Sequence, residues 1–544
     1  MHPAMDDALR QVQEYVLRAN AFMTKLRTLR NSSVHVNRVP TELLAEILCH
    51  AIPPSKRSDI SLLNRVTHVC RHWRTVALDA AELWGTLWID CPSDYDAFDE
   101  SDDDRDELPS FIEEYLRRSK SYPLDVTIMG LNGTRVDDCI EVLQSHQHRV
   151  RKLRIQAEDH ETMRSVLPRL SYMDAPLLED LRLGAALPSY SIVYPPLIFQ
   201  PHDLFGGHFP PLHSIYLSDV SLSLSAESNI LRNLQHLILT GQGISITEMD
   251  TLFDILDRCP DLKTLKLHSS GLSPSTAPQH PSRTDRVVLL PSLRVASIDW
   301  EQSMVAGWLL THLCLPETAN LNVVLSRDDH LPVRASIRTL SSIRTLRIAI
   351  EEELLIQGYA HHNKPSFIRK SLRPTKSALS LCMRFHTEEE ARDHFTHFLQ
   401  AHRDVSLFSA VDTLTIGRGD FYLPDHWASL FEVMPGLRML HVCGVDKSLS
   451  SCLAALCASD TARGQSVTYV RPRLAALQIL EIQGMRGLQN EDSKAALTRA
   501  VRLMSMEGAL QTLRLNGRSP WHAGVDAELL RQFCTVEITE VASD

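Results

Sequence analysis

The sequence predicts an α/β protein: a small N-terminal module of three helices, followed by a solenoid of repeated strand-and-helix units. Three observations predict this fold. A short leucine pattern recurs from about residue 108 onward, a dense helical block occupies residues 34–90, and a run of acidic residues separates the two. Repeats that bury one apolar face against their neighbours stack into solenoids, so the recurring pattern determines the larger part of the prediction.

Composition narrows the function classes. Of 544 residues, 44% are hydrophobic and 23% charged, with a formal net charge of -11. This balance is typical of a soluble globular protein, and the negative charge argues against a nucleic-acid partner. No window of about 18 apolar residues exists and the first residues lack a secretion signal, so no membrane association is expected. Eleven widely spaced cysteines without a C-x-x-C pair should stay reduced, which favours the cytoplasm or the nucleus.

Residues 1–33 are predicted to form one amphipathic helix. Apolar residues recur there at helical spacing, with Arg and Glu between them. The favoured interpretation is a helix that packs on the next module. A short coiled-coil arm is the alternative, but fewer than four clean heptads are present, so the sequence alone does not establish dimerisation.

The module at residues 34–90 begins with a proline-led helix. Pro40 suits a first turn, where its missing N–H would be unpaired in any case. Pro53-Pro54 ends this helix. Its apolar residues form two columns on one face, made by Leu43, Leu44, Ile47 and Leu48. A second amphipathic stripe runs through Leu62, Val66, Val69, Cys70, Trp73 and Ala77. The block closes with Leu83, Trp84, Leu87 and Trp88.

The order of these features resembles the F-box. The shared pattern is Pro-x-Glu-Leu-Leu-x-x-Ile, a gap, then Val-Cys-x-x-Trp-Arg-x-x-Ala and Leu-Trp, over about residues 36–90. Val39 stands where the family usually has leucine. The resemblance implies docking on the Skp adaptor of a cullin–RING ubiquitin ligase. It implies an adaptor interface at, or just above, Pro40, Leu43, Leu44, Ile47, Val69 and Trp73.

Residues 91–108 are predicted to be an acidic linker. Between 93 and 107, nine of fifteen residues are Asp or Glu and only Arg105 is basic. Such a run repels itself and buries nothing, so we expect no regular structure. The alternative interpretation is an acidic segment that attracts a basic binding partner.

Residues 109–544 are predicted to be an irregular leucine-rich-repeat domain. The pattern Pro-x-Leu-x-x-φ-x-φ, where φ is apolar, starts at Pro176, Pro210, Pro260, Pro291 and Pro435. The last two apolar positions alternate like inward side chains of a short strand. Helices should lie between strands at 137–148, 247–258, 388–400 and 492–506. Spacing is uneven, with wide gaps near 300–340 and 350–410. With the F-box-like helices, this is similar to the large fungal F-box set.

The resulting hypothesis is a substrate receptor without an active site, in which the repeats bind an unknown protein substrate. No cofactor and no metal is expected. The best metal candidate, His394 and His397, lacks the H-E-x-x-H pattern and is interpreted as part of a solvated helix. The alternative is a leucine-rich scaffold without a ubiquitin-ligase role, in which the helical module only caps the repeats.

Overall fold

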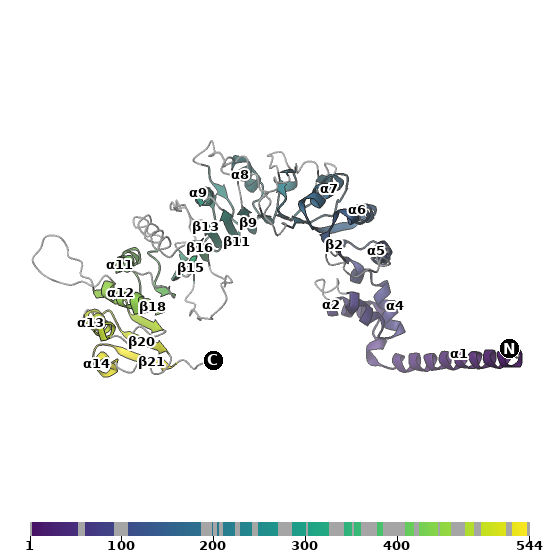
Figure 1. The fold of residues 1–544 in the computed structure, drawn as a ribbon, viewed down its shortest axis with the longest axis horizontal. Coiled ribbons are helices and arrows are strands. Elements are labelled where there is room, and N and C mark those ends of the chain that lie inside the picture. Colours follow the sequence, from purple (N-terminus) through teal and green to yellow (C-terminus); the bar gives the residue numbers. More distant parts are fainter. Residues whose placement is uncertain are drawn as a thin grey trace, which may run out of the picture. The chain divides into compact units, whose positions relative to one another are not determined.

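A computed structural model shows a mixed α/β protein with N-terminal helices and mostly parallel strands (Figure 1). The structure describes residues 3–52, 60–91, 107–186, 198–199, 204–205, 210–222, 229–241, 249–269, 286–300, 303–325, 342–350, 353–360, 378–384, 408–417, 424–443, 446–457, 474–483, 491–506, 508–517 and 525–540. The chain divides into two compact units. The N-terminal unit is Met1–Leu222 with Glu227–Ile230, and the C-terminal unit is Ser223–Ala226 with Leu231–Asp544.

The first element is α1 (Pro3–Ser32), a single helix of 30 residues. The predicted helix is therefore present. Its side chains, however, are exposed along nearly its whole length. The expected packing of its apolar residues on the next module is wrong.

Three helices follow, as the sequence predicts: α2 (Thr41–Ala51), α3 (Ile60–Thr67) and α4 (Arg71–Asp79). Short 3-10 turns flank them, η1 (His35–Arg38) before and η3 (Ala81–Trp84) after. α4 contacts both α2 and α3. The small core between them is made by Leu44, Leu48, Ile52, Leu63, Val76, Ala77, Leu83 and Trp84.

The sheet of the N-terminal unit is parallel throughout. Its order is β1 (Thr86–Asp90), β2 (Leu124–Leu131), β3 (Val150–Ala157), β4 (Asp180–Ala185) and β6 (Ser214–Ser218). Between consecutive strands run α5 (Glu107–Arg118), α6 (Val136–Ser145) and α7 (His160–Leu170), which lie along one side of the sheet (Figure 1). Two-residue strands β5 (Ile198–Phe199) and β7 (Ser221–Leu222) pair separately.

Apolar side chains line up across this sheet in register. One buried row joins Leu87, Val126, Leu153, Leu181 and Ile215, and the next joins Ile89, Ile128, Ile155, Leu183 and Leu217. Each strand thus contributes two inward residues that only its neighbours can cover. The predicted burial of the Leu-x-Leu pair on β4 is confirmed.

β1 changes the expected relation between the helical module and the sheet. The sequence separates them at residues 91–108, but β1 already pairs with β2 from Thr86↔Asp125 to Asp90↔Met129. Trp84 packs edge-on against Tyr115 of α5, with ring centroids 5.0 Å apart. The expectation that the acidic run keeps the two parts independent is contradicted. Residues 92–106 of that run lie outside the described residues, and α5 begins at Glu107.

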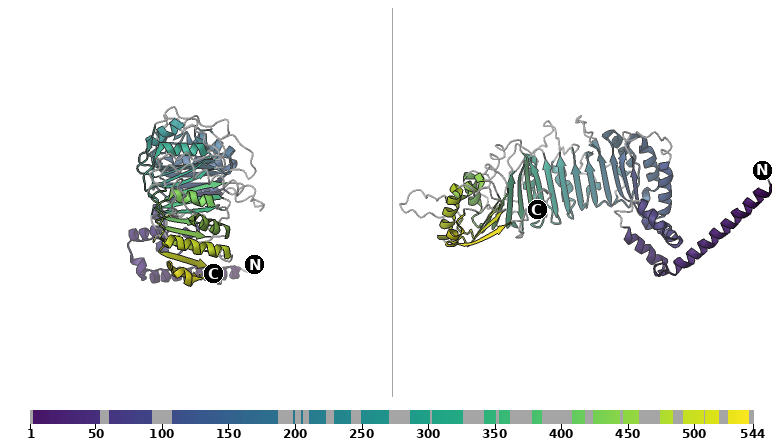
Figure 2. Two further views of the ribbon diagram at one scale, coloured as in Figure 1. Left: turned by 90° about the vertical axis from the view of Figure 1, so that its left-hand side faces the viewer. Right: turned by 60° about the horizontal axis from the view of Figure 1, so that its bottom comes forward.

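The C-terminal unit continues the same construction. Its strands pair in the order β8 (His236–Thr240), β9 (Thr264–Ser269), β11 (Val295–Trp300), β13 (Asn320–Leu325), β16 (Leu379–Arg384), β15 (Glu353–Tyr359), β14 (Thr345–Ile350), β17 (Thr413–Ile416), β18 (Met439–Cys443), β19 (Ile479–Gln483), β20 (Thr512–Gly517) and β21 (Thr535–Glu540). Figure 2 shows the teal strands of this unit running side by side. The inward pairs that the pattern predicts after Pro260 and Pro435, Leu265/Leu267 and Leu440/Val442, are buried, which confirms them. Leu237 and Leu239 on β8 are buried in the same way.

Helices accompany these strands: α8 (Met249–Asp257), α9 (Ser303–His312), α11 (Pro424–Val433), α12 (Asp446–Cys457), α13 (Glu491–Met506) and α14 (Ala527–Arg531). The strands β10 (Val288–Leu289) and β12 (Leu313–Cys314) form a small separate pair. The helices predicted at 137–148, 247–258 and 492–506 correspond to α6, α8 and α13. The one predicted at 388–400 lies outside the described residues.

One stretch departs from the sequential order. β13 pairs with β16 rather than β14, and β15 is antiparallel to both β14 and β16. Between β13 and β17 the three strands therefore lie in the reverse of their chain order, β16, β15 and β14. This segment falls where the sequence shows wide gaps between copies of the pattern.

Candidate docking site

Helix α2 presents two different apolar columns. It starts directly after Pro40, whose carbonyl accepts a 2.9 Å hydrogen bond from the amide of Leu44. One column, Leu44 with Leu48, faces the module core, and Leu44 is 0% exposed. The other column is Leu43 with Ile47, one helical turn apart, at 50% and 46% exposure. We call these two residues the exposed α2 pair.

The turn between α3 and α4 exposes another aliphatic residue. Val69 lies between the end of α3 and Cys70, the extended residue that precedes α4. Its side chain is 57% exposed. The turn is fixed on both sides, because the Arg74 side chain donates from Nε to the carbonyl of Thr67 at 3.0 Å. Val69 is thus exposed on a turn whose backbone is held in place by this hydrogen bond.

Trp73 is half-buried, and its indole is anchored. Nε1 donates to Oδ1 of Asn37 at 2.7 Å, and Asn37 Nδ2 donates to the carbonyl of Asn31 at 2.8 Å. These two bonds tie α4 through η1 to the last turn of α1. Sequence reasoning missed Asn37, since a polar contact between residues so far apart leaves no periodic signal.

Together these positions separate packing residues from accessible ones. Leu44 is turned into the core and Trp73 serves partly as a structural anchor, while Pro40, the exposed α2 pair and Val69 remain accessible. A small helical module that keeps aliphatic side chains uncovered has the character of a protein-docking domain, since an uncovered apolar patch costs solubility unless a partner hides it.

The comparison with known families agrees with this class. Residues 36–90 match the F-box-like family. The matched stretch contains η1, the three helices, η3 and β1. No curated protein matches the chain.

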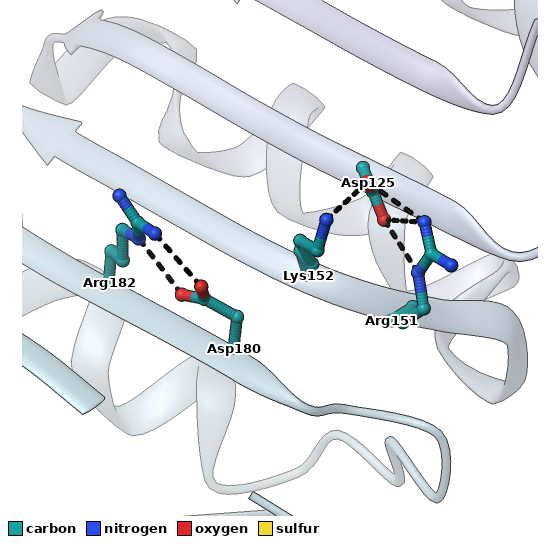
Figure 3. Close-up of polar contacts among 5 residues, drawn as sticks. All are labelled: Asp125, Arg151, Lys152, Asp180 and Arg182. Atoms are coloured by element: carbon teal, nitrogen blue, oxygen red, sulfur yellow. Dashed lines mark hydrogen bonds and ion pairs between the residues drawn. The ribbon is translucent and has the colours of Figure 1, made fainter. Parts of the chain in front are cut away.

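A second candidate surface lies on the polar side of the N-terminal unit's sheet. Figure 3 shows Asp125 of β2 held by Arg151 and Lys152 of β3, with nitrogen-to-oxygen distances of 2.9 to 3.0 Å. On β4, Arg182 makes a two-pronged pair with Asp180 at 2.9 Å for both bonds. The hydrogen bond to Asp180 raises the pKa of Arg182.

The adjacent row on the same side mixes aromatic and cationic residues. In register it joins Trp88, Thr127, Arg154, Arg182 and Tyr216. Arg154 and Arg182 are direct neighbours in this row. Among the described residues no acidic partner of Arg154 occurs. Because Asp180 already pairs with Arg182, Arg154 is the guanidinium group of this row that can take an anionic ligand.

Other site classes have little support in the described part of the chain. There, no cluster of three or more His, Cys, Asp or Glu side chains could hold a metal ion. Nor does a described helix combine the length and apolar character needed to cross a bilayer. His394 and His397 lie outside the described residues.

Proposed function

We propose that this protein is the substrate-recognition subunit of a Skp/cullin/F-box ubiquitin ligase. The observation that carries the proposal is the exposed α2 pair, within residues that match the F-box-like family. F-box domains typically bind the Skp adaptor and through it a cullin. Two aliphatic side chains one turn apart on a short helix suit insertion into an apolar groove.

The strands and helices after residue 109 are proposed to be an irregular leucine-rich-repeat domain that binds the substrate. Support comes from the in-register rows of buried aliphatic residues. Leu153, Leu181 and Ile215 share one row, and α7 lies between β3 and β4 in the chain. Units of this kind have little core of their own, and so they need stacked neighbours.

The substrate class that this domain favours is an acidic protein segment. Arg154, which shares its row with Trp88 and Tyr216, supports this, because a guanidinium group pairs with carboxylate or phosphate oxygens. Arg154→Glu would separate substrate binding from adaptor binding. It should leave adaptor binding intact and reduce the set of proteins that the assembled ligase ubiquitylates.

The protein would have no catalytic residues of its own. Ubiquitin transfer would belong to its partners, and this chain would raise the local concentration of substrate near them. The protein is proposed to lie in the cytoplasm, the nucleus or both. There it would bind the Skp adaptor, and its widely spaced cysteines would stay reduced.

Co-purification with a Skp adaptor tests the proposal. The wild-type chain should retain the adaptor, and Leu43→Asp with Ile47→Asp should lose it, since two charges would be trapped in an apolar interface. Leu177→Asp is the matched control: Leu177 is 45% exposed, close to Ile47 in this respect, but lies between α7 and β4. Hydrogen exchange of α2 and α4 amides would show that the double variant stays folded.

Two outcomes would count against the proposal. Retention of the adaptor by the folded double variant would remove the exposed α2 pair from the interface. A wild-type chain that never binds a Skp adaptor would favour the scaffold alternative, in which the helical module only caps the repeats.

A further inference from the structure

Helix α1 exposes an unusual amount of apolar surface. Tyr15 is 76% exposed and Phe22 is 62% exposed, although both are large aromatic side chains. The exposed apolar residues of α1 are Met5, Leu9, Val12, Tyr15, Val16, Leu17, Phe22, Met23, Leu26 and Leu29. Such a concentration on one helix is costly in water and is characteristic of an interface.

These residues follow the spacing of a coiled coil. Steps of four and three alternate without interruption from Met5 to Leu26, which gives a period of 3.5 residues over three heptads. In heptad notation the core positions, d and a in turn, are Met5, Leu9, Val12, Val16, Ala19, Met23 and Leu26. Among the exposed apolar residues, Leu17 falls at position b, away from this seam.

The two flanks of the seam differ in character. The g positions are apolar, with Ala8, Tyr15, Phe22 and Leu29, and widen the apolar face. The e positions are polar, with Asp6, Gln13, Asn20 and Arg27. In an antiparallel pair, the e positions of one helix lie beside the e positions of the other, and the g positions lie beside the g positions. The polar flank of one helix would then face the polar flank of its partner, and the apolar flank would face the apolar flank.

Charge along α1 is also divided by position. The first half carries Asp6, Asp7 and Glu14 against Arg10, whereas the second half carries Arg18, Lys25, Arg27 and Arg30 without an acidic residue. Glu14 is already paired with Arg18 at 2.7 Å. Within the described residues neither Asp6 nor Arg27 makes an ion pair or a side-chain hydrogen bond.

From this geometry we infer that α1 binds α1 of a second copy of this chain as an antiparallel coiled coil. In that register Leu9 lies opposite Leu26 of the second copy, and Val16 opposite Ala19 of the second copy. Asp6 then faces Arg27 of the second copy, and Gln13 faces Asn20 of the second copy. Opposite charges and complementary amides meet along one flank, while Tyr15 meets Phe22 of the second copy along the other.

A parallel pair would be less favourable. It would place Arg30, the next core position, directly against Arg30 of the second copy, and it would align the basic halves of both helices. The antiparallel arrangement instead places Arg30 at the acidic end of the second copy. It also opposes the two helix dipoles favourably.

The oligomeric state of the full-length protein tests this inference. Sedimentation equilibrium should show a concentration-dependent dimer, and Val16→Glu should convert it to a monomer by placing a charge at the centre of the seam. Leu17→Glu is the matched control, since it makes a closely similar chemical change on the adjacent residue outside the seam and should leave the dimer intact. Circular dichroism would show that both variants keep α1 helical.

Orientation is tested by exchanging charges. Arg27→Asp should weaken dimerisation about tenfold, because it sets a second carboxylate against Asp6 at both ends of each dimer. Adding Asp6→Arg to the same chain should restore it, as the pair is merely reversed. Failure of the second change to rescue would overturn the antiparallel arrangement.

A chain that stays monomeric in the high-micromolar range, or a Val16→Glu variant that still dimerises, would overturn the inference altogether. Sedimentation with anionic vesicles that is abolished by Val16→Glu in a monomeric wild-type chain would identify α1 as a membrane-surface helix instead, which also contradicts it. None of these outcomes depends on adaptor binding. The exposed α2 pair is unchanged in every variant.

Discussion

The indole Nε1 of Trp73 donates a 2.7 Å hydrogen bond to the side-chain oxygen of Asn37, across 36 residues of sequence. This contact joins α4 to the turn that precedes α2. It keeps the tryptophan in a fixed orientation while part of the ring stays accessible. The orientation of Trp73 therefore depends on Asn37, a polar residue outside the apolar pattern of the module.

We expect Trp73→Phe to loosen the helical module without changing its apolar packing greatly. The lost bond is partly buried, so the cost should be about 1 kcal/mol. Faster hydrogen exchange of α2 and α4 amides would measure it. In a double-mutant cycle, Trp73→Phe should add little once Asn37→Ala has removed their shared bond, and additive costs would show that the two residues act separately.

Leu43 and Leu44, neighbours in sequence, should respond oppositely to truncation. Leu44→Ala leaves a cavity in a fully buried site and should cost about 3 kcal/mol in local stability. Leu43→Ala should change stability by no more than about 0.5 kcal/mol, because the side chain is half exposed. Hydrogen exchange reports the stability, and titration with the adaptor reports binding. A loss of affinity restricted to Leu44→Ala would contradict the assignment of Leu43 to the interface.

Arg149 is predicted to hold together the end of α5 and the start of β3. Its guanidinium is buried and donates to the carbonyls of Leu116 (3.0 Å) and Tyr122 (3.3 Å) and to the hydroxyl of Ser119 (2.8 Å). Burial lowers the pKa of Arg149. Arg149→Met would leave these acceptors without their donor and should cost about 3 kcal/mol, seen as lost amide protection in α5 and β2.

Arg149→Lys is the informative companion variant. It keeps a positive charge but cannot direct a planar fork of donors at several acceptors. We expect it to recover less than half of the lost stability. Full recovery would mean that charge alone, rather than the bonding geometry, is what the site requires.

His441 should make the C-terminal unit less stable in acid. Burial lowers its pKa below the ordinary value, while Glu481, 3.8 Å away, and Gln483 oppose this lowering without reversing it. Above about pH 6.5 the ring is neutral in both states. As the pH falls below this value the unfolded chain takes up the proton first, so stability is lost progressively until the pH reaches the folded pKa.

Urea unfolding of His441→Gln and of wild type between about pH 5 and 7.5 checks this prediction. The variant should show the smaller loss of stability in acid. His50→Gln, which alters an exposed histidine on α2, is the control and should follow the wild type. Parallel pH curves for His441→Gln and wild type would contradict a role for the buried ring.

The strand pattern was predictable because both of its inward positions are aliphatic and buried, as with Leu265 and Leu267 on β9. On β19 the two inward positions are Leu480 and Ile482, which are also aliphatic and buried. The direction in which a strand runs, by contrast, cannot be predicted from its amino-acid composition. β15 contains the apolar run Leu354-Leu355-Ile356 without a leading Pro-x-Leu, and nothing in those residues reveals that it runs antiparallel.

The candidate site was predictable to a similar degree. Helical spacing identified Leu43, Leu44, Ile47 and Trp73, but α2 has two apolar columns and spacing alone could not say which one faces the core. The same ambiguity affected α1, where an apolar stripe on a long helix fits both packing and exposure. In both cases the answer depends on what lies next to the helix in space.

The pairing of β1 with β2 limits how this protein can be recombined. A chimera joined after residue 90 would carry Leu87 and Ile89 away from the strand that covers them. It would also leave the remaining sheet with an open edge at Val126 and Ile128. Open apolar edges invite aggregation. The helices α2 to α4 and the sheet should therefore be transferred as one block, because a junction upstream of Ala81 would in turn take Leu83 and Trp84 out of the core of the helical module.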